Sequence, residues 1–562
     1  MFLWISRCLP GLNLVLFIVL LVFAFTDVDE WIPWLSCAFL ERRAYHKTEP
    51  GNAPESPPVT LKFSQKIYMW YTIFVHLDTV VFSSRLSYAL VRVRHRMKKT
   101  LARRNEYNAP LQGDDITAAP KAGAAPMNEV MHAIILPNYA EDIETLTATL
   151  RVLASHPRAA HQYEVYLAME QKEKDSPSKA SSLRNAFEHK FLAVRSTFHP
   201  VGLPDEVAGK GSNVSFAARA IFEHHRMDKS KHDVVITVID SDTHLARDYF
   251  TEVRRLHHTN PNSANALYVC PIIFDRNAHD IPIFVRVADI LWGCAGLAGF
   301  LPGAPVHIPT SVYSIPLGLA EDVGGWDGDA TAIGEDMHMM IKSYFNSHGR
   351  LVTLPVYSAA SQCNISSARP RGWRRFVDTL QARWRQALRH MWGALDIGYA
   401  MRRMMKLRML RLSNLPLFHL LWEAHFLPTH FVLMILASAL YEFFKPAHLI
   451  HPDLKWTFAF TGLVRTVSFL IMQLAFCFYD AYHALCVNTR AMDMAKAGIP
   501  ETFAYRRPWH WRYLLDRISF PVAGVMYGAL PAFYAQIAHF WTDKLVYGVS
   551  VKPLLSAAGM IP

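Results

Sequence analysis

Two aspartates separated by one residue, Asp240 and Asp242, are the first candidates for chemistry in this 562-residue chain. They follow the apolar, largely β-branched run 233–239, which predicts a buried parallel strand, and ligands collect at the carboxyl ends of such strands. Carboxylate oxygens at that place suit Mg2+ or Mn2+, ions that bridge protein carboxylates to a diphosphate. An Asp-rich turn would give the same pattern, so the rest of the chain must decide between a metal site and a turn.

Two further groups of residues have the right types for chemistry. Glu335 and Asp336 open a predicted helix, where the helix dipole favours carboxylates whatever their function. In residues 381–393 arginines alternate with Trp and His. Arginine binds phosphate through charge-assisted hydrogen bonds and tryptophan stacks on sugar rings, although a basic amphipathic helix is the alternative. The candidates in this group are Arg383, Trp384, Gln386, Arg389 and His390.

The elements that must position these residues alternate between strands and helices. The predicted strands are 132–139, 163–170, 233–239 and 267–274, and the predicted helices are 146–153 and 213–227. The first two strands and the helix between them form a βαβ unit. This alternation predicts a doubly wound α/β domain that binds a nucleotide along its strand ends.

Apolar residues make up 51% of the chain, and they concentrate at the start of the chain and after residue 415. This distribution predicts membrane helices on both sides of a soluble domain. The predicted parts are 1–104, with membrane helices at about 11–26 and 67–91 and a basic cytosolic flank; 105–128, a flexible linker; 129–394, the catalytic domain; 395–415, an amphipathic interfacial helix; and 416–562, with spans at about 417–442, 457–479 and 519–541.

Two of these spans leave alternatives open. Residues 11–26 form either a signal anchor or a cleaved signal sequence, and we favour the anchor because no clear small-residue cleavage site follows before Asp27. Residues 67–91 contain His76, Asp78 and Arg85. An interfacial or buried helix is therefore the alternative to a span in that segment.

The net charge of +11 bears on topology, because Lys and Arg gather beside the apolar spans. That placement predicts a multi-pass membrane protein with its catalytic domain in the cytosol, in the plasma membrane or a Golgi or ER membrane. Nucleic-acid binding is not expected, since the basic residues adjoin spans. The seven cysteines contain no Cys-x-x-Cys pair, so neither a disulfide framework nor a zinc site is expected.

Taken together, the order of these signals resembles the processive branch of glycosyltransferase family 2, the membrane-embedded polysaccharide synthases that include cellulose, chitin and hyaluronan synthases. The resemblance covers about residues 130–400 and the plan of spans on both sides. It implies a GT-A type nucleotide-sugar-binding domain of the α/β class, with a doubly wound mixed sheet. This domain would be inserted between N-terminal and C-terminal transmembrane helices.

The resemblance implies which residues bind the donor. In the family the first strand ends in Pro-x-Tyr-Asn-Glu, and Pro137, Tyr139 and Glu141 match that motif. Ala140 stands in place of its Asn. Asp242 corresponds to the second residue of the metal-binding Asp-x-Asp, which implies Mg2+ or Mn2+ as cofactor. The other implied donor residues are Glu170 as the uridine contact, Lys210 in a Gly-Lys-Gly turn facing the phosphates, and Asp240 as the first metal ligand.

The resemblance also implies an acceptor site at Glu335 and Asp336, which match a Glu-Asp pair following a Gly-Gly-aromatic turn. Asp336 would be the general base.

The family's Gln-x-x-Arg-Trp motif, which implies a clamp for the acceptor and the diphosphate, fits two registers. Gln386, Arg389 and His390 keep the Gln and the Arg but have His in place of Trp. Arg383 and Trp384 keep the Arg-Trp pair but lack the Gln. We favour the first register, whose histidine makes a non-processive enzyme an alternative.

The function implied is an inverting, metal-dependent transfer of sugar from a nucleotide-sugar, expected to be a UDP-sugar, to a growing β-linked polysaccharide. One alternative is a non-processive transferase that acts on a lipid or a short acceptor at the cytosolic leaflet. A second alternative is a catalytically silent membrane scaffold. The implied partners are the donor, a polysaccharide or lipid-linked acceptor, and the bilayer.

Overall fold

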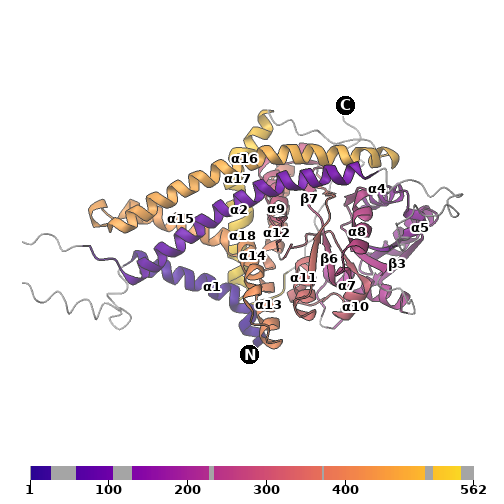
Figure 1. The fold of residues 1–562 in the computed structure, drawn as a ribbon, viewed down its shortest axis with the longest axis horizontal. Helices are drawn as coiled ribbons and strands as arrows, with labels where there is room; N and C mark the ends of the chain where they lie inside the picture. The colour runs from indigo at the N-terminus through magenta and orange to yellow at the C-terminus, as the bar shows by residue number, and fades with distance from the viewer. Residues whose placement is uncertain are drawn as a thin grey trace, which may run out of the picture.

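The computed structural model describes residues 2–26, 59–104, 130–204, 206–226, 233–304, 306–369, 372–499 and 510–545. The predicted linker 105–128 lies outside these residues. Figure 1 shows a part built around a β-sheet on one side and a group of long helices extending away from it on the other. The division between an α/β part and a helical part therefore follows the predicted order along the chain.

The main sheet has seven strands in the order β3-β2-β1-β4-β8-β6-β9. Strands β1 to β4 are mutually parallel, and β8 is antiparallel to both of its neighbours, so the sheet is mixed as expected. Ile134 of β1 lies opposite Val165 of β2 and Thr237 of β4. The strands are β1 (Met131–Asn138), β2 (Tyr163–Glu170), β3 (Ala193–His199), β4 (Val234–Val238), β6 (Ala266–Val269), β8 (Tyr313–Pro316) and β9 (Val352–Pro355).

The predicted strand 267–274 is wrong in one respect, because the chain leaves the main sheet in its middle. Cys270 and Pro271 separate β6 from β7 (Ile272–Phe274), since proline cannot donate a backbone hydrogen bond to a ladder. β7 instead joins β5 (His244–Leu245) and β10 (Ala360–Gln362) in a small second sheet. This sheet lies just beyond the end of β4.

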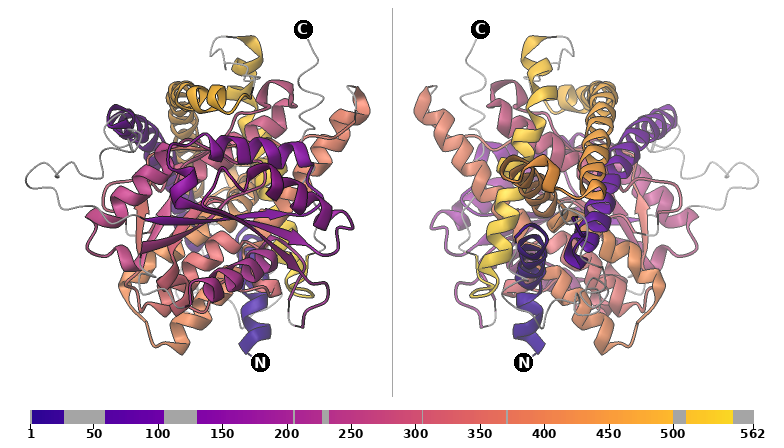
Figure 2. Two further views of the ribbon diagram at one scale, coloured as in Figure 1. Left: turned by 90° about the vertical axis from the view of Figure 1, so that its right-hand side faces the viewer. Right: turned by 90° about the vertical axis from the view of Figure 1, so that its left-hand side faces the viewer.

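Helices cover both faces of the main sheet, as the side views in Figure 2 show. Alternate residues of β1 point to opposite faces, so Ile134 and Leu136 join one buried cluster and Ala133 and Ile135 the other. Helices α4 (Ile143–Ala154), α6 (Ser176–Phe187) and α8 (Asp248–Thr259) pack on the first face. Helices α7 (Lys210–His224), α11 (Glu335–Asn346) and the C-terminal half of α2 (Phe63–Ala102) pack on the second.

Between the sheet and the long helices lie α9, α12, α13 and α14, as Figure 1 shows. Their bounds are α9 (Ile283–Leu297), α12 (Trp373–Trp392), α13 (Leu395–Lys406) and α14 (Leu415–His425). The short elements are α5 (Ala159–Gln162), α10 (Leu317–Asp322), η5 (Ser263–Asn265), η6 (Ala278–Asp280), η7 (Ala330–Ala332), η8 (Leu412–Asn414) and η9 (Ala447–Leu449).

Four helices in the described part of the chain are long and apolar enough to cross a membrane: Leu3–Phe25, Leu427–Phe444, Pro452–Lys496 and Tyr513–Ala538. The protein is therefore a membrane protein by composition. The predicted span 417–442 is divided between α14 and α15 near Phe426. The elements concerned are α1 (Phe2–Phe25), α15 (Leu427–Phe444), α16 (Pro452–Lys496), α17 (Trp511–Gly524), the π-helical turn η10 (Val525–Ala529) and α18 (Leu530–Ala538).

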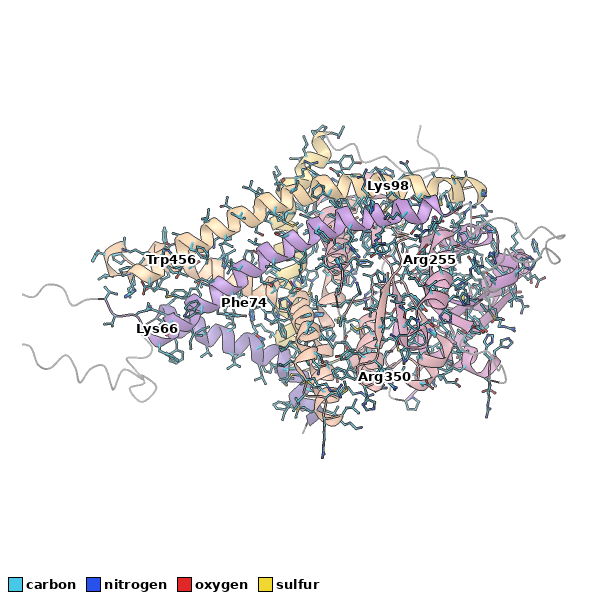
Figure 3. The ribbon with its side chains drawn as sticks, viewed as in Figure 1. Lys66, Phe74, Lys98, Arg255, Arg350 and Trp456 are labelled. Carbon is cyan, nitrogen blue, oxygen red and sulfur yellow. The ribbon has the colours of Figure 1, made fainter. Side chains whose placement is uncertain are left out.

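Helix α2 (Phe63–Ala102) contains the predicted span 67–91 but is not among these four. Its polar residues lower its hydropathy. Its first half nevertheless exposes Trp70 and Phe74, and the adjacent α16 exposes Trp456 in the same elongated half of the molecule (Figure 3). Lys98, near the other end of α2, lies beside the α/β part (Figure 3). The crossing by α2 stays a prediction, which this shared apolar surface favours.

Helices α2 and α16 run side by side and continue onto the α/β part (Figure 1). At 45 residues, α16 is about 68 Å long, roughly twice the hydrocarbon thickness of a bilayer. Near its C-terminal end the buried Asp493 binds Arg104 (2.8 Å) and the Nε of Arg247 (2.7 Å). Arg490 binds the buried Asp275 at 2.9 Å. These ion pairs fix both long helices to the α/β part.

The predicted interfacial helix 395–415 differs from the structure in its length and burial. The helix α13 ends at Lys406, and its first residues, 395–400, are all buried. At Gly398 a side chain would lie 2.2 Å from the carbonyl oxygen of Ser6, so glycine is needed where α13 meets α1. An exposed basic face remains only beyond this contact, and its placement in the membrane interface stays a prediction.

Candidate active site

The predicted site residues, all but Trp384, line one cavity of about 610 Å³. This follows from the sheet, because β2, β1 and β4 are parallel neighbours and their carboxyl ends open on the same edge. Helices α7, α11 and α12 bring the remaining groups to that edge. The residues are Pro137, Tyr139, Glu141, Glu170, Lys210, Asp240, Asp242, Glu335, Asp336, Arg383, Gln386, Arg389 and His390.

Lys210 joins the two acidic pairs of the sequence. Its ammonium lies 2.8 Å from Asp240 and 2.7 Å from Glu335. Burial alone would lower the pKa of Lys210, but these two carboxylates raise it above its usual value, so the side chain stays charged. The neighbouring Gly211 allows this approach, since a side chain there would lie 3.1 Å from the carbonyl oxygen of Ala332.

The Asp240–Asp242 pair is held by the second sheet. Gln362 of β10 donates its amide to Asp240 at 2.8 Å, and the backbone N–H of Cys363 donates to the fully buried Asp242 at 2.9 Å. The same Gln362 amide also donates to Ser311. Two fixed carboxylates at the cavity wall are hard oxygen donors of the kind that Mg2+ and Mn2+ prefer, so the residues present fit such an ion.

Asp336 lies one residue into α11 and faces the same cavity. Burial and the charge of Glu335 raise the pKa of Asp336 to about 7, against the opposing effect of Lys210. A carboxylate with such a pKa accepts a proton near neutral pH more readily than an ordinary aspartate.

On α12 the structure separates the two registers of the Arg-containing motif. Arg383 is buried and its guanidinium binds Asp289 of α9 at 2.9 Å, so its charge serves an ion pair between α12 and α9. Trp384 packs beside the apolar cluster of Ala288, Ala387 and Tyr527 instead of lining the cavity. This arrangement favours the register of Gln386, Arg389 and His390, all three of which line the cavity.

An indole from another helix accompanies His390. Trp292 of α9 also lines the cavity, and its ring stacks on that of His390 with centroids 4.1 Å apart and planes 16° apart. The two rings together form an aromatic surface of the kind that packs against sugar faces. Only a spatial contact reveals this pair, because the two residues lie far apart in the sequence.

The donor-side strand ends carry some unexpected contacts. Glu170 accepts a hydrogen bond from His199 at 3.0 Å, and the pKa of His199 is raised by that carboxylate despite burial. Ala140 adopts a left-handed backbone conformation (φ 56°), which asparagine tolerates better than alanine. The Ala140 N–H donates to Glu173 at 3.0 Å, and this bond holds the turn.

The Gly-Gly-Trp turn before α11 is held by the helix itself. Gly324 and Gly325 have φ values of 83° and 67°, which favour glycine. Lys342 of α11 donates to the carbonyl of Gly325 (2.8 Å) and binds Asp327 (2.6 Å). His338, one turn earlier, also binds Asp327, at 3.1 Å. The turn therefore positions α11 rather than contributing a reacting group.

A pH dependence of stability follows from His338. Burial would lower its pKa, but Asp396 and Asp327 raise it to about 9, above the usual 6.5 of an unfolded chain. The stabilisation is therefore complete below pH 6.5 and is lost as the pH rises through about 9.

We expect the stability advantage of the wild type over a His338→Gln variant to shrink by up to about 3 kcal/mol across this window. Thermal unfolding in detergent at pH 6, 7.5 and 9 measures it, and a difference that is constant with pH would contradict the ion pairs.

The sequence matches the model of a known protein family over part of its length. Residues 235–479 match the model of a family described as Glycosyl transferase family group 2. That stretch runs from β4 and the Asp240–Asp242 pair that follows it, through Glu335, Asp336 and α12, into α16. A search of curated protein sequences finds no match.

Two solved structures are similar to this chain. The first is the mannosyltransferase PcManGT from Pyrobaculum calidifontis in complex with GDP-Man and Mn2+, at 15% identity and a TM-score of 0.36, covering 75% of this chain and 97% of that one. The second is glucosyl-3-phosphoglycerate synthase from Mycobacterium tuberculosis in complex with phosphoglyceric acid, at 14% identity and a TM-score of 0.26, covering 45% and 75%.

The matched segment contains both acidic pairs and the helix with the favoured Arg-containing register. The mixed α/β sheet is also the one expected for a GT-A type domain. The chain is therefore a glycosyltransferase enzyme, and residues 235–479 are the part that is similar to the family.

Proposed function

We propose that this protein is a membrane-embedded, inverting and metal-dependent transferase that moves a sugar from a nucleotide-sugar to a growing β-linked polysaccharide. The observation that carries the proposal is one cavity shared by the Asp240–Asp242 pair, Lys210, Asp336 and helices of the apolar part of the chain. The proposal assigns the protein to the polysaccharide synthase branch of the family, with a UDP-sugar as the expected donor.

The acceptor side follows from Asp336. Its carboxylate takes the proton from an acceptor hydroxyl as that oxygen attacks the anomeric carbon of the donor sugar, and the bond from that carbon to the diphosphate breaks. A single displacement inverts the anomeric configuration, so an α-linked donor gives a β-linked product. Glu335 keeps Lys210 oriented at 2.7 Å.

On the donor side, positively charged side chains would stabilise the leaving diphosphate. Lys210 and Arg389 line the cavity and would bind its phosphate oxygens by charge-assisted hydrogen bonds. Asp240 and Asp242 would hold Mg2+ or Mn2+, which when bound neutralises charge developing on the leaving group. Glu170, Tyr139, Glu141 and Pro137 form the wall where the nucleoside would lie.

A specific observation favours a second candidate, transfer to a lipid acceptor at the cytosolic leaflet. Towards the long helices the cavity is walled largely by apolar side chains, together with the ion pair of Arg85 and Glu423. Such a lining suits an alkyl chain better than a hydrated glycan. The apolar lining residues there include Phe82, Leu420, Leu427, Pro428, Phe431 and Gly528.

The topology is part of the proposal. The basic residues after the apolar half of α2 support an orientation with the α/β domain in the cytosol, in a multi-pass protein of the plasma membrane or a Golgi or ER membrane. The third candidate, a silent scaffold, is disfavoured because the acidic pairs and Lys210 converge on one cavity as an active enzyme requires.

Product analysis tests the proposal. Purified full-length protein in nanodiscs would be given Mn2+ or Mg2+, a panel of UDP- and GDP-sugars and membrane lipid, and the products would be sized by mass spectrometry. We expect turnover of one donor and a ladder of β-linked products. A single sugar on a lipid would establish the second candidate instead, and a protein that binds nucleotide but turns over no donor would support the scaffold.

A further inference from the structure

A buried ion pair connects the catalytic helix to the membrane-facing part of the protein. The Nδ1 of His338, on α11, lies 2.5 Å from the Oδ1 of Asp396, on α13. The two residues are 1% and 0% exposed. Tyr399 of α13 packs on the imidazole, with ring centroids 4.2 Å apart. These contacts join α11 and α13 across a buried interface.

The ion pair acts on the turn that carries the catalytic carboxylates. The backbone N–H of His338 donates to the carbonyl of Gly334 at 2.9 Å, which closes the first turn of α11 around Glu335 and Asp336. Asp396 and Asp327 both bind the imidazole of His338. The first turn of α11 therefore cannot rotate about the helix axis without breaking a buried ion pair. Breaking such a pair is costly because it leaves a charge buried and unpaired.

Helix α13 is in turn fixed by α1, one of the four helices able to cross a membrane. The backbones meet at Gly398 and Ser6, where even a methyl group would overlap. On its other side α1 packs on α18, where Gly11 lies against Phe540 and Gln536. The N-terminal end of α1 therefore packs against both α13 and α18, and these contacts leave α13 little freedom to move.

We propose that the His338–Asp396 ion pair is a positioning link through which α1 and α13 fix the first turn of α11, and with it the Asp336 carboxylate. The inference rests on the proposed role of Asp336 as general base. It adds that the rate of transfer depends on a membrane helix that contacts neither donor nor acceptor. The donor residues Lys210 and Asp240 lie on α7 and after β4. Lys210 also contacts Glu335, in the turn concerned, but it keeps its ion pair with Asp240, so donor binding should change less than the rate of transfer.

Steady-state kinetics on the full-length protein in nanodiscs test the link. We expect His338→Gln and Asp396→Asn each to lower kcat by about 10- to 100-fold with the donor KM within about twofold, because small misplacements of a reacting group cost that much. The double variant should be no slower than the slower single variant, since both remove one interaction. Double-variant losses that multiply would overturn the link.

A matched control separates positioning from loss of stability. His225, at the end of α7, is also buried and binds Glu164 at 3.0 Å, remote from α11. His225→Gln should lower the melting temperature comparably while kcat stays near that of the wild type. If it lowers kcat as much as His338→Gln does, the effect is general destabilisation and the inference is wrong.

The buried substitutions could prevent folding, and loss of UDP binding would reveal that. A further variant tests the link in that case. Gly398→Ala leaves all charges in place and pushes α1 from α13. A kcat lowered at least about fivefold with an unchanged donor KM supports the link, and an unchanged kcat overturns it. Asp336→Asn is run in parallel: activity in that variant would overturn the assignment of the base itself, whatever the His338 variants do.

Discussion

Replacing Asp336 by asparagine is expected to slow sugar transfer by about 10²- to 10⁴-fold, the usual contribution of a general base. The amide keeps the size of the side chain but cannot accept the proton from the acceptor hydroxyl. Nucleotide binding should stay within about twofold, because Lys210 and Asp240 lie on other elements. Initial rates of nucleoside diphosphate release and isothermal titration with UDP measure the two quantities.

The matched control is Asp329→Asn, which changes an exposed carboxylate in the loop before α11. Asp329 accepts a hydrogen bond from the N–H of Thr331 at 2.7 Å and is not among the residues that line the cavity. Its variant should transfer sugar at the wild-type rate. Full activity of Asp336→Asn would mean that another group is the general base, and the adjacent Glu335 would be the first candidate.

The second large effect is expected at the proposed metal site. Asp242→Asn should lower turnover at least about 100-fold and abolish its dependence on Mn2+, since a bound ion contributes several kcal/mol to stabilising charge on the leaving group. Asp242 is fully buried and accepts the Cys363 N–H, so an amide is accommodated there only with a weakened contact. Titration of EDTA-treated protein with Mn2+ in the presence of UDP measures the loss.

The control for this variant flanks the same strand at its other end. Asp233 stands at the opposite end of β4, so Asp233→Asn changes one charge without touching the cavity. It should keep the Mn2+ dependence of the wild type. Wild-type turnover that persists after EDTA treatment would mean that Lys210 and Arg389 alone balance the diphosphate charge.

The sheet and the donor side were largely predictable, for a physical reason. Central parallel strands are buried on both faces, so each is a continuous apolar run, and its chemistry-bearing residues follow it directly. The strand 163–170 was predicted to the residue. Because parallel strands end on one edge, separate signals such as Tyr139, Glu170 and Asp240 were bound to converge.

The parts that could not be predicted depend on contacts between distant segments. Gln362 holds Asp240 from a three-residue strand, and Trp292 reaches His390 from another helix. Neither residue has a local pattern that marks it. The same holds for the partner of His338: the histidine stands beside the acidic pair in the sequence, but Asp396 lies 58 positions later, on another helix.

Local periodicity also misled at α13. Its basic and apolar residues alternate as in a helix at a membrane surface, but residues 395–400 are buried. The sequence pattern cannot show that Gly398 admits a second helix. Hydropathy also fails to group α2 with the four apolar helices, although α2 packs side by side with α16, which is one of them.

The continuous helices α2 and α16 have a mechanical consequence. Both pass without a break from the apolar half of the molecule to the α/β half, and the ion pairs of Asp493 and Arg490 fasten them there. A helix is far stiffer than a coil linker, so the apolar half and the α/β half keep a fixed distance from each other, unlike a domain on a flexible tether. In the proposed membrane topology this fixed distance would hold the active site at one height above the bilayer, and acceptors of the wrong length would be rejected before any side chain discriminates among them.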